Sequence, residues 1–130
     1  MKMKYKTKEI IDMYNALDEF SKKDIEMPSV LAWNIYDNII TLKQVFDKFV
    51  LFRSNAFENL NNLNAFEAPD KNGFMKVKKE FENDLKTANA RIEEYLEIDN
   101  EIDIIKINRE DLPKVLTLKD IKALHFMINN

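Results

Sequence analysis

Four carboxylates in the stretch EIDNEIDIIKINRE, residues 97–110, have the spacing of calcium ligands. Asp99, Glu101, Asp103 and Glu110 take the first, third, fifth and twelfth positions of a calcium-loop template. That template needs glycine at its sixth position, where the chain turns sharply around the ion. Here the sixth residue is Ile104, and a β-branched residue resists a left-handed turn. We therefore interpret these carboxylates as the solvent-facing side of a strand and predict no metal site.

A second group of residues has the spacing of a metal-dependent nuclease motif. Pro69 and Asp70 precede Asp84 and Lys86 in the order that such a motif requires. The chemistry needs carboxylates and a lysine that converge on Mg²⁺ from adjacent strands. Asp84 and Lys86 stand two residues apart on an expected helix, so they point to different faces. We expect no catalysis from this group.

His125 is the single histidine, so any Ser-His catalysis would depend on it. A lone histidine on an amphipathic helix is more often a residue at the rim of the core. The sequence contains no GxGxxG, Walker-type or HExxH motif. We predict that the protein is not an enzyme and uses no cofactor.

Composition predicts one helical domain that spans residues 1–130. Hydrophobic residues make up 45% of the chain and include nine Phe, which is enough for a core. One Gly and three Pro favour helices over open loops, and the absence of Cys excludes disulfides and thiolate-bound zinc. The net charge of −3 makes nucleic-acid binding unexpected. Without an apolar run after the lysine-rich start, or a long apolar segment, we expect an intracellular protein with no membrane contact.

Hydrophobic spacing predicts an N-terminal helix, followed along the chain by a long antiparallel helical hairpin. Met3 and Tyr5 alternate with lysines as in a strand over residues 2–6, and Thr7 can cap a helix that fades near Ser21. After Pro28, a long helix is expected over residues 29–63, then a loop at 62–74 and a helix over 75–96. The seam of the long helix is formed by residues seven positions apart: Ile35, Leu42, Phe49, Ala56 and Leu63.

The C-terminal part of the chain predicts a strand and a short helix. Isoleucines alternate with acidic residues, which predicts a strand over residues 101–107 paired with residues 2–6. Opposite charges on the two strands would favour that pairing. Thr117 and Asp120 form a capping-box pattern before a helix over residues 118–129. The predicted fold is therefore mainly α, with a helical hairpin, a two-stranded ribbon and a C-terminal helix.

Two aromatic residues of the long helix are candidates for contact with a partner. Trp33 has apolar neighbours, which favour a place in the core, although Trp also anchors protein interfaces. Phe52 lies off the main seam beside Arg53, so we expect it to be exposed. The candidate partner-binding residues are Phe52, Arg53, Glu93, Glu94, Glu97 and Asp99.

Four segments resemble small proteins of tailed phages that infect Gram-positive bacteria, a family of unknown function. They are MKMKYKTKEIIDMYNALDEF, DKNGFMKVKKEFENDL, EIDNEIDIIKINREDL and LTLKDIKALHFMI. The resemblance covers most of the chain and implies a phage or prophage origin. It provides no catalytic residue to transfer.

Together these observations favour a non-enzymatic protein that acts by binding another protein. One form is a virion or assembly component, which could be a homo-oligomer formed through the hairpin. The alternative is an inhibitor of a host defence protein or nuclease, similar to anti-CRISPR proteins, whose acidic surface imitates nucleic-acid phosphates. In either case the expected location is the host cytoplasm, with the virion as a further site for an assembly component.

Overall fold

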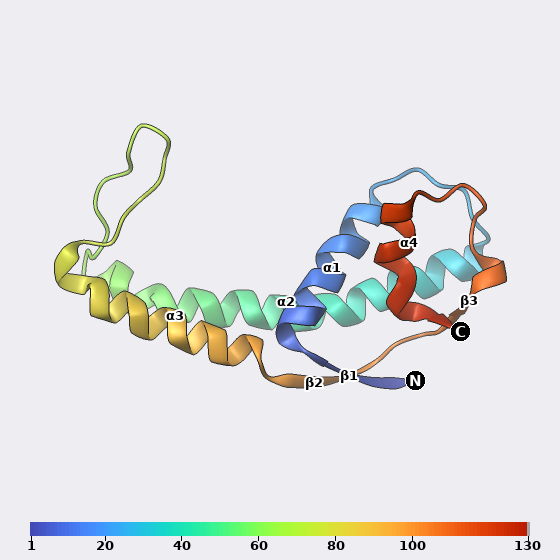
Figure 1. Cartoon of the computed structure of the whole chain (residues 1–130), viewed down its shortest axis with the longest axis horizontal. Coiled ribbons are helices and arrows are strands. Elements are labelled where there is room, and N and C mark those ends of the chain that lie inside the picture. Colours follow the sequence, from blue (N-terminus) through green and yellow to red (C-terminus); the bar gives the residue numbers. More distant parts are fainter. Residues whose placement is uncertain (130) are drawn as a thin grey trace. The chain divides into compact units, whose positions relative to one another are not determined.

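The computed structural model describes residues 1–129 (Figure 1) and divides into two compact units. The first unit combines residues 1–47 with the segment from residue 99 onward, and the second comprises residues 48–98. The long helix α2 (Ser29–Asn62) contributes residues to both units. The mainly helical fold with a small ribbon is as predicted, whereas the single domain stays a prediction.

The first unit contains short strands, helices and 3₁₀ turns from both ends of the chain. In addition to the first part of α2, its elements are β1 (Lys2–Lys6), α1 (Thr7–Ser21), β2 (Asp99–Asp103), β3 (Ile107–Asn108), η2 (Arg109–Asp111), α4 (Leu118–Leu124), η3 (His125–Met127) and β4 (Ile128–Asn129).

Strands β1 and β2 form the predicted antiparallel ribbon. Lysines and acidic residues face each other in the register, since Lys2 lies opposite Asp103 and Lys4 opposite Glu101. Each such cross-strand pair of opposite charges contributes about 0.2–1 kcal/mol and opposes a one-residue slip. Lys6 continues the pattern opposite Asp99, so the charge pairing expected from the sequence is confirmed.

The start of α1 differs from the prediction by one residue. Lys6 occupies the cap position, and its backbone N–H donates to the Glu9 carboxylate over 3.0 Å. Thr7 is instead the first helical residue, with a buried side chain. Its hydroxyl oxygen accepts a hydrogen bond from the Asn100 amide on β2 at 2.8 Å. Thr7 therefore connects the helix to the ribbon.

The strand predicted over residues 101–107 is wrong at its C-terminal end, because β2 ends at Asp103. The next three residues stay linked to neighbours through different partners. The Ile104 N–H donates to the Met1 carbonyl at 3.0 Å, and the Lys106 ammonium donates to the Phe126 carbonyl at 2.9 Å. Ile107 then begins β3, which pairs in parallel with β4.

The buried side chain of Asn38 on α2 takes the place of a strand partner for Ile105. Its Oδ1 accepts a hydrogen bond from the Ile105 N–H at 2.8 Å, and its Nδ2 donates to the Ile105 carbonyl at 3.0 Å. The same Nδ2 lies 3.5 Å from the Met127 sulfur. The alternation of buried and exposed side chains shifts by one residue after Ile105. Ile102 and Ile104 are buried, Ile105 is exposed, and the next buried isoleucine is Ile107.

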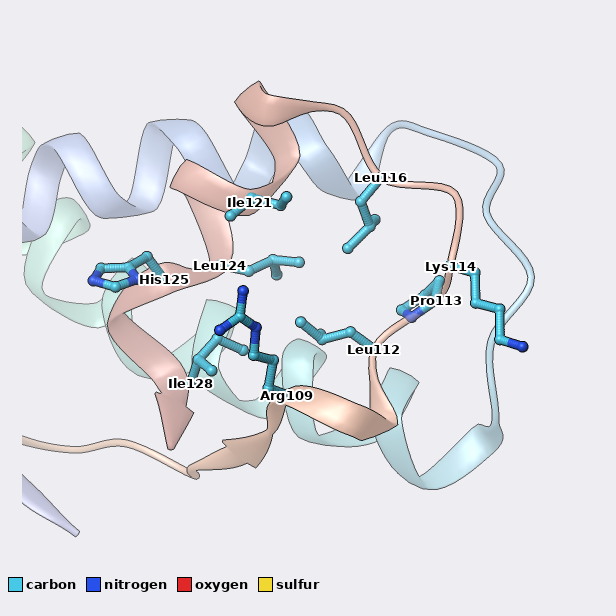
Figure 2. Close-up of a pocket in the computed structure, with 9 residues that line it drawn as sticks. All are labelled: Arg109, Leu112, Pro113, Lys114, Leu116, Ile121, Leu124, His125 and Ile128. Atoms are coloured by element: carbon cyan, nitrogen blue, oxygen red, sulfur yellow. The ribbon is translucent and has the colours of Figure 1, made fainter. Parts of the chain in front are cut away.

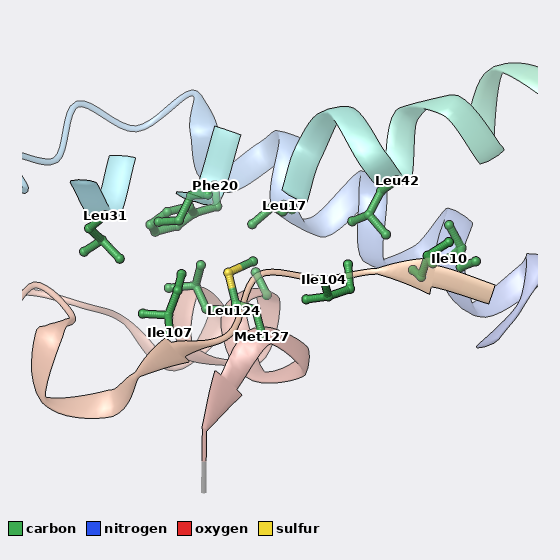
Figure 3. Packing of buried hydrophobic residues seen from close by; sticks show 12 residues of the cluster. Ile10, Leu17, Phe20, Leu31, Leu42, Ile104, Ile107, Leu124 and Met127 are labelled. Carbon is green, nitrogen blue, oxygen red and sulfur yellow. The ribbon is translucent and has the colours of Figure 1, made fainter. Parts of the chain in front are cut away.

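One hydrophobic cluster joins most of the elements of the first unit. Figure 3 shows Leu17 and Phe20 of α1 directed toward Leu124 and Met127 near the C-terminus. The side of α2 that packs into this cluster consists of Leu31, Ile35, Asn38 and Leu42. Asn38 is therefore a polar residue within an otherwise apolar stripe. Ile10, Ile102, Ile104, Ile107 and Ala123 complete the buried set.

Helix α4 begins at the predicted capping box but is shorter than expected. The Thr117 hydroxyl accepts from the Asp120 N–H at 3.2 Å, and the Asp120 carboxylate accepts from the Thr117 N–H at 3.0 Å. Asp120 is buried and also pairs with the Lys23 ammonium at 2.7 Å. The helix predicted to reach residue 129 ends at Leu124, because the chain tightens into η3 and then pairs as β4.

The second unit is a helical hairpin, as predicted. Residues 48–62 of α2 lie against α3 (Glu82–Leu96), which follows the short turn η1 (Lys79–Phe81). Phe49 and Phe52 of α2 contact the ring of Tyr95 near the end of α3, and Leu60 packs with Ala88 near its middle, so the helices run antiparallel.

The loop of this hairpin is more ordered than its composition suggests. The Asp70 Oδ1 accepts hydrogen bonds from the N–H groups of Asn72 and Phe74 at 2.8 and 3.1 Å. Gly73 has a φ of +82°, a conformation that costs glycine little. Val77 forms an antiparallel bridge with Phe66. Residues 75–78 are therefore extended, and the helix predicted from residue 75 begins later.

Replacing Asn38 with Ala should destabilise the protein more than most single substitutions. The Ile105 N–H and C=O would both lose their partner, and each unsatisfied group costs about 1–3 kcal/mol. Urea denaturation should therefore show a loss of roughly 2 kcal/mol or more, whereas Asn15→Ala, at an exposed position of α1, should change little. A loss in Asn38→Ala no larger than that of the control would contradict this role.

Asp120 should give the protein a specific sensitivity to acid. The Lys23 hydrogen bond and then the Thr117 backbone N–H lower the pKa of Asp120. Because the folded-state pKa lies below the unfolded-state value, the ionised group stabilises the fold above pH about 4, and this contribution is lost as the pH falls through the folded-state pKa.

The comparison of wild type with Asp120→Asn tests this dependence. The free energy of unfolding should be lower in the variant at neutral pH, and the difference should shrink below pH about 4. Asp37→Asn, at an exposed position of α2, provides the matched control. A difference that stays constant through the acidic range would show that the Asp120 charge does not stabilise the fold.

Candidate functional site

Phe52 and Arg53 belong to an aromatic and cationic cluster in the second unit. Phe52 is half-buried instead of exposed, because its ring stacks on Tyr95 with centroids 4.3 Å apart. The Arg91 guanidinium lies 5.7 Å from the centre of the Phe52 ring, and Arg53 lies 5.6 Å from that of Phe49. Such stacking contributes about 0.5–1.5 kcal/mol beyond area burial, so Phe52 has a clear structural role.

The predicted acidic residues fall in both units. Glu93 and Glu94 are exposed in the last turn of α3, and Glu97 is its C-cap residue. Asp99 is exposed at the start of β2 in the first unit, opposite Lys6. The last turn of α3 contains no basic residue, although a helix C-terminus favours positive charge. The helix itself therefore gives no reason for this acidity.

Trp33 lies outside the core, contrary to the preferred prediction. Trp33 is 65% exposed. Its neighbours on the same helix face, Val30 and Tyr36, are 73% and 51% exposed. The rings of Trp33 and Tyr36 meet edge to face with centroids 5.9 Å apart. Leu31 and Ile35 lie four residues apart on the buried face of α2. Trp33 is two residues from each, so its side chain projects from the opposite side of the helix, toward solvent.

The Trp33 face is defined by Val30, Trp33, Tyr36 and Ile40, which all lie on α2 within the first unit. Ser29, Ala32, Trp33 and Tyr36 line a shallow hollow on this surface. Sequence reasoning proposed Trp33 as an interface residue only as an alternative. The exposed set could have been found by comparing the position of Trp33 with the seven-residue seam.

Two of the residues considered for metal or catalytic chemistry, Asp103 and Asp70, have structural roles. Asp99, Glu101 and Asp103 lie on one face of β2, where the Met1 amino group donates to Asp103 at 2.9 Å and lowers its pKa. Asp70 stabilises a turn, and His125 is exposed in η3. Within residues 1–129, no three His, Asp or Glu side chains gather closely enough to hold a metal ion.

The chain matches no protein-family model, no curated protein and no solved structure. In the described part of the chain, no helix combines the length and the apolar character needed to cross a membrane.

Proposed function

We propose that the chain is a non-enzymatic protein of phage origin that binds another protein, as a component of the virion or of its assembly. The observation that carries this proposal is the exposure of the Trp33 face. A contact that removes apolar surface from water gains about 25 cal/mol per Å² of the surface that it buries. Contiguous exposed residues of this kind mark interaction surfaces more often than isolated ones do.

The composition of the Trp33 face suits a protein contact. Trp and Tyr are enriched among the residues that dominate binding energy, because each buries a large rigid surface and keeps a polar atom for hydrogen bonding. The face lies on a regular helix, so its side chains are held in position before contact. A second copy of the chain is the simplest partner, since isologous contact lets the same face bury itself.

The single tryptophan makes this proposal directly measurable. Sedimentation should show self-association as the concentration rises, and the Trp33 emission should shift to shorter wavelength over the same range because water leaves the indole. Trp33→Ala should weaken association at least tenfold, which corresponds to about 1.4 kcal/mol. Leu51→Ala removes another exposed apolar side chain and is the matched control, expected to associate normally.

A strictly monomeric protein with concentration-independent Trp33 emission would contradict self-association. Association that survives Trp33→Ala unchanged would show that another surface is responsible.

The second candidate function is inhibition of a host defence protein or nuclease through acidic residues. The observation that favours it is the acidity of the last turn of α3, where Glu93 and Glu94 lie near backbone carbonyls without a basic residue in that turn. Negative charge at a helix C-terminus costs about 0.3–1 kcal/mol. A binding function would account for acidic residues that the helix does not favour.

Reversal of Glu93, Glu94 and Glu97 to Lys separates stability from binding. Lysines at positions 93 and 94 should interact favourably with the helix end, and so keep the free energy of unfolding equal or raise it by about 0.3–1 kcal/mol per residue. Capture of a nucleic-acid-binding host protein should be abolished, and wild-type capture should weaken as salt increases. Glu58→Lys, at an exposed position of α2, should retain capture; equal capture by all variants would exclude the acidic surface.

A further inference from the structure

A pocket of about 340 Å³ lies in the first unit between η2, the connector that follows it and the C-terminal segment. Figure 2 shows it as a mostly apolar hollow, with the Arg109 side chain entering from η2. Its apolar wall includes Leu112, Leu116, Ile121, Leu124 and Ile128. Leu124 is fully buried, so the floor belongs to the hydrophobic core of this unit.

Positive charge dominates the polar lining of this pocket. Among residues 1–129, Arg109, Lys114 and His125 are the titratable residues that line it, and no Asp or Glu of that range does, although the whole chain has a net charge of −3. The neighbouring acidic residues Glu110 and Asp111 line a different pocket.

The Arg109 guanidinium is the cation directed into the hollow. In Figure 2 it lies between Leu124 and Ile128, whereas the Lys114 side chain extends away from the pocket. Among residues 1–129, the guanidinium forms no ion pair, no hydrogen bond and no contact with an aromatic ring. An arginine beside apolar side chains without an anionic partner presents a fork of donors that matches a carboxylate.

We propose that this pocket binds a small molecule in which one carboxylate is joined to an apolar body. The carboxylate would accept two parallel hydrogen bonds from Arg109, and the apolar body would cover Leu112, Leu116 and Ile121. Ligand sites typically combine apolar walls with few polar groups, and this volume lies near the lower end of their range of about 300–1,000 Å³. The site is independent of the Trp33 face and of the acidic residues at the end of α3.

Titration with octanoate, followed by backbone amide NMR, tests this assignment on the whole chain. Octanoate should shift the amides of Arg109, Leu124 and His125 in a saturable way. Octan-1-ol has the same apolar chain without the charge and should bind at least tenfold more weakly. Acetate carries the charge without the chain and should not bind.

Two variants of the pocket test which groups recognise the ligand. Arg109→Gln should reduce octanoate affinity at least tenfold, whereas Arg91→Gln, in the second unit, should leave it unchanged. Ile121→Glu places a carboxylate on a half-exposed position of the pocket wall and should abolish octanoate binding. Because Arg109 and Ile121 are exposed, both variants should keep the amide spectrum of the folded protein.

Three results would overturn the proposal: no saturable octanoate binding, equal affinity for octan-1-ol, or equal affinity in Arg109→Gln and wild type. A short apolar peptide with an unblocked C-terminus serves as a second probe. If that peptide shifts the same amides while octanoate does not, the pocket takes a peptide end and the small-molecule assignment is wrong.

Discussion

The paired hydrogen bonds between the Asn38 amide and the Ile105 backbone are the constraint on which the first unit depends. An extended segment crosses the buried face of α2 at this point, and no strand within residues 1–129 pairs with Ile105 to satisfy its backbone. The side-chain amide supplies one acceptor and one donor in the positions that a strand would provide. Because both groups of Ile105 are satisfied, the chain can change from one two-stranded pairing to another while its isoleucines remain in the core.

Two functional candidates of the first unit, Trp33 and Arg109, lie on the elements that this contact joins or follow them in the chain. The phase that places Leu31, Ile35, Asn38 and Leu42 inward requires Trp33 to point away from the core. The transition after Ile105 also directs the chain into β3 and η2, which brings Arg109 to the wall of its pocket. One helical phase of α2 therefore places Asn38 in the core and Trp33 at the surface.

Local signals in the sequence predicted the elements, but pairing between distant residues limited the details. Seven-residue spacing predicted α2, and apolar spacing after the loop rich in Asn, Pro and Gly predicted α3. The alternating charges predicted that residues 2–6 pair with the acidic strand, but not the register of that pairing. The end of β2 was missed because Asn38 is 67 residues from Ile105 and looks like an ordinary helix residue. Trp33 was misplaced because neighbouring apolar residues suggested burial, whereas helical phase determines its exposure. The Arg109 pocket joins residues from η2 and the C-terminus, and no local pattern predicts such a pocket.

Hydrogen exchange at the Ile105 amide tests the central role of Asn38 most directly. The N–H lies just beyond the end of β2 in a residue that is itself exposed, so without the Asn38 oxygen it would exchange as a loop amide does. We predict protection comparable to that of Ile102 within β2 in the wild type, and loss of that protection at Ile105 before β2 opens in Asn38→Ala. Exchange at Ile105 as fast as at the exposed Val115 in the wild-type protein would contradict the account.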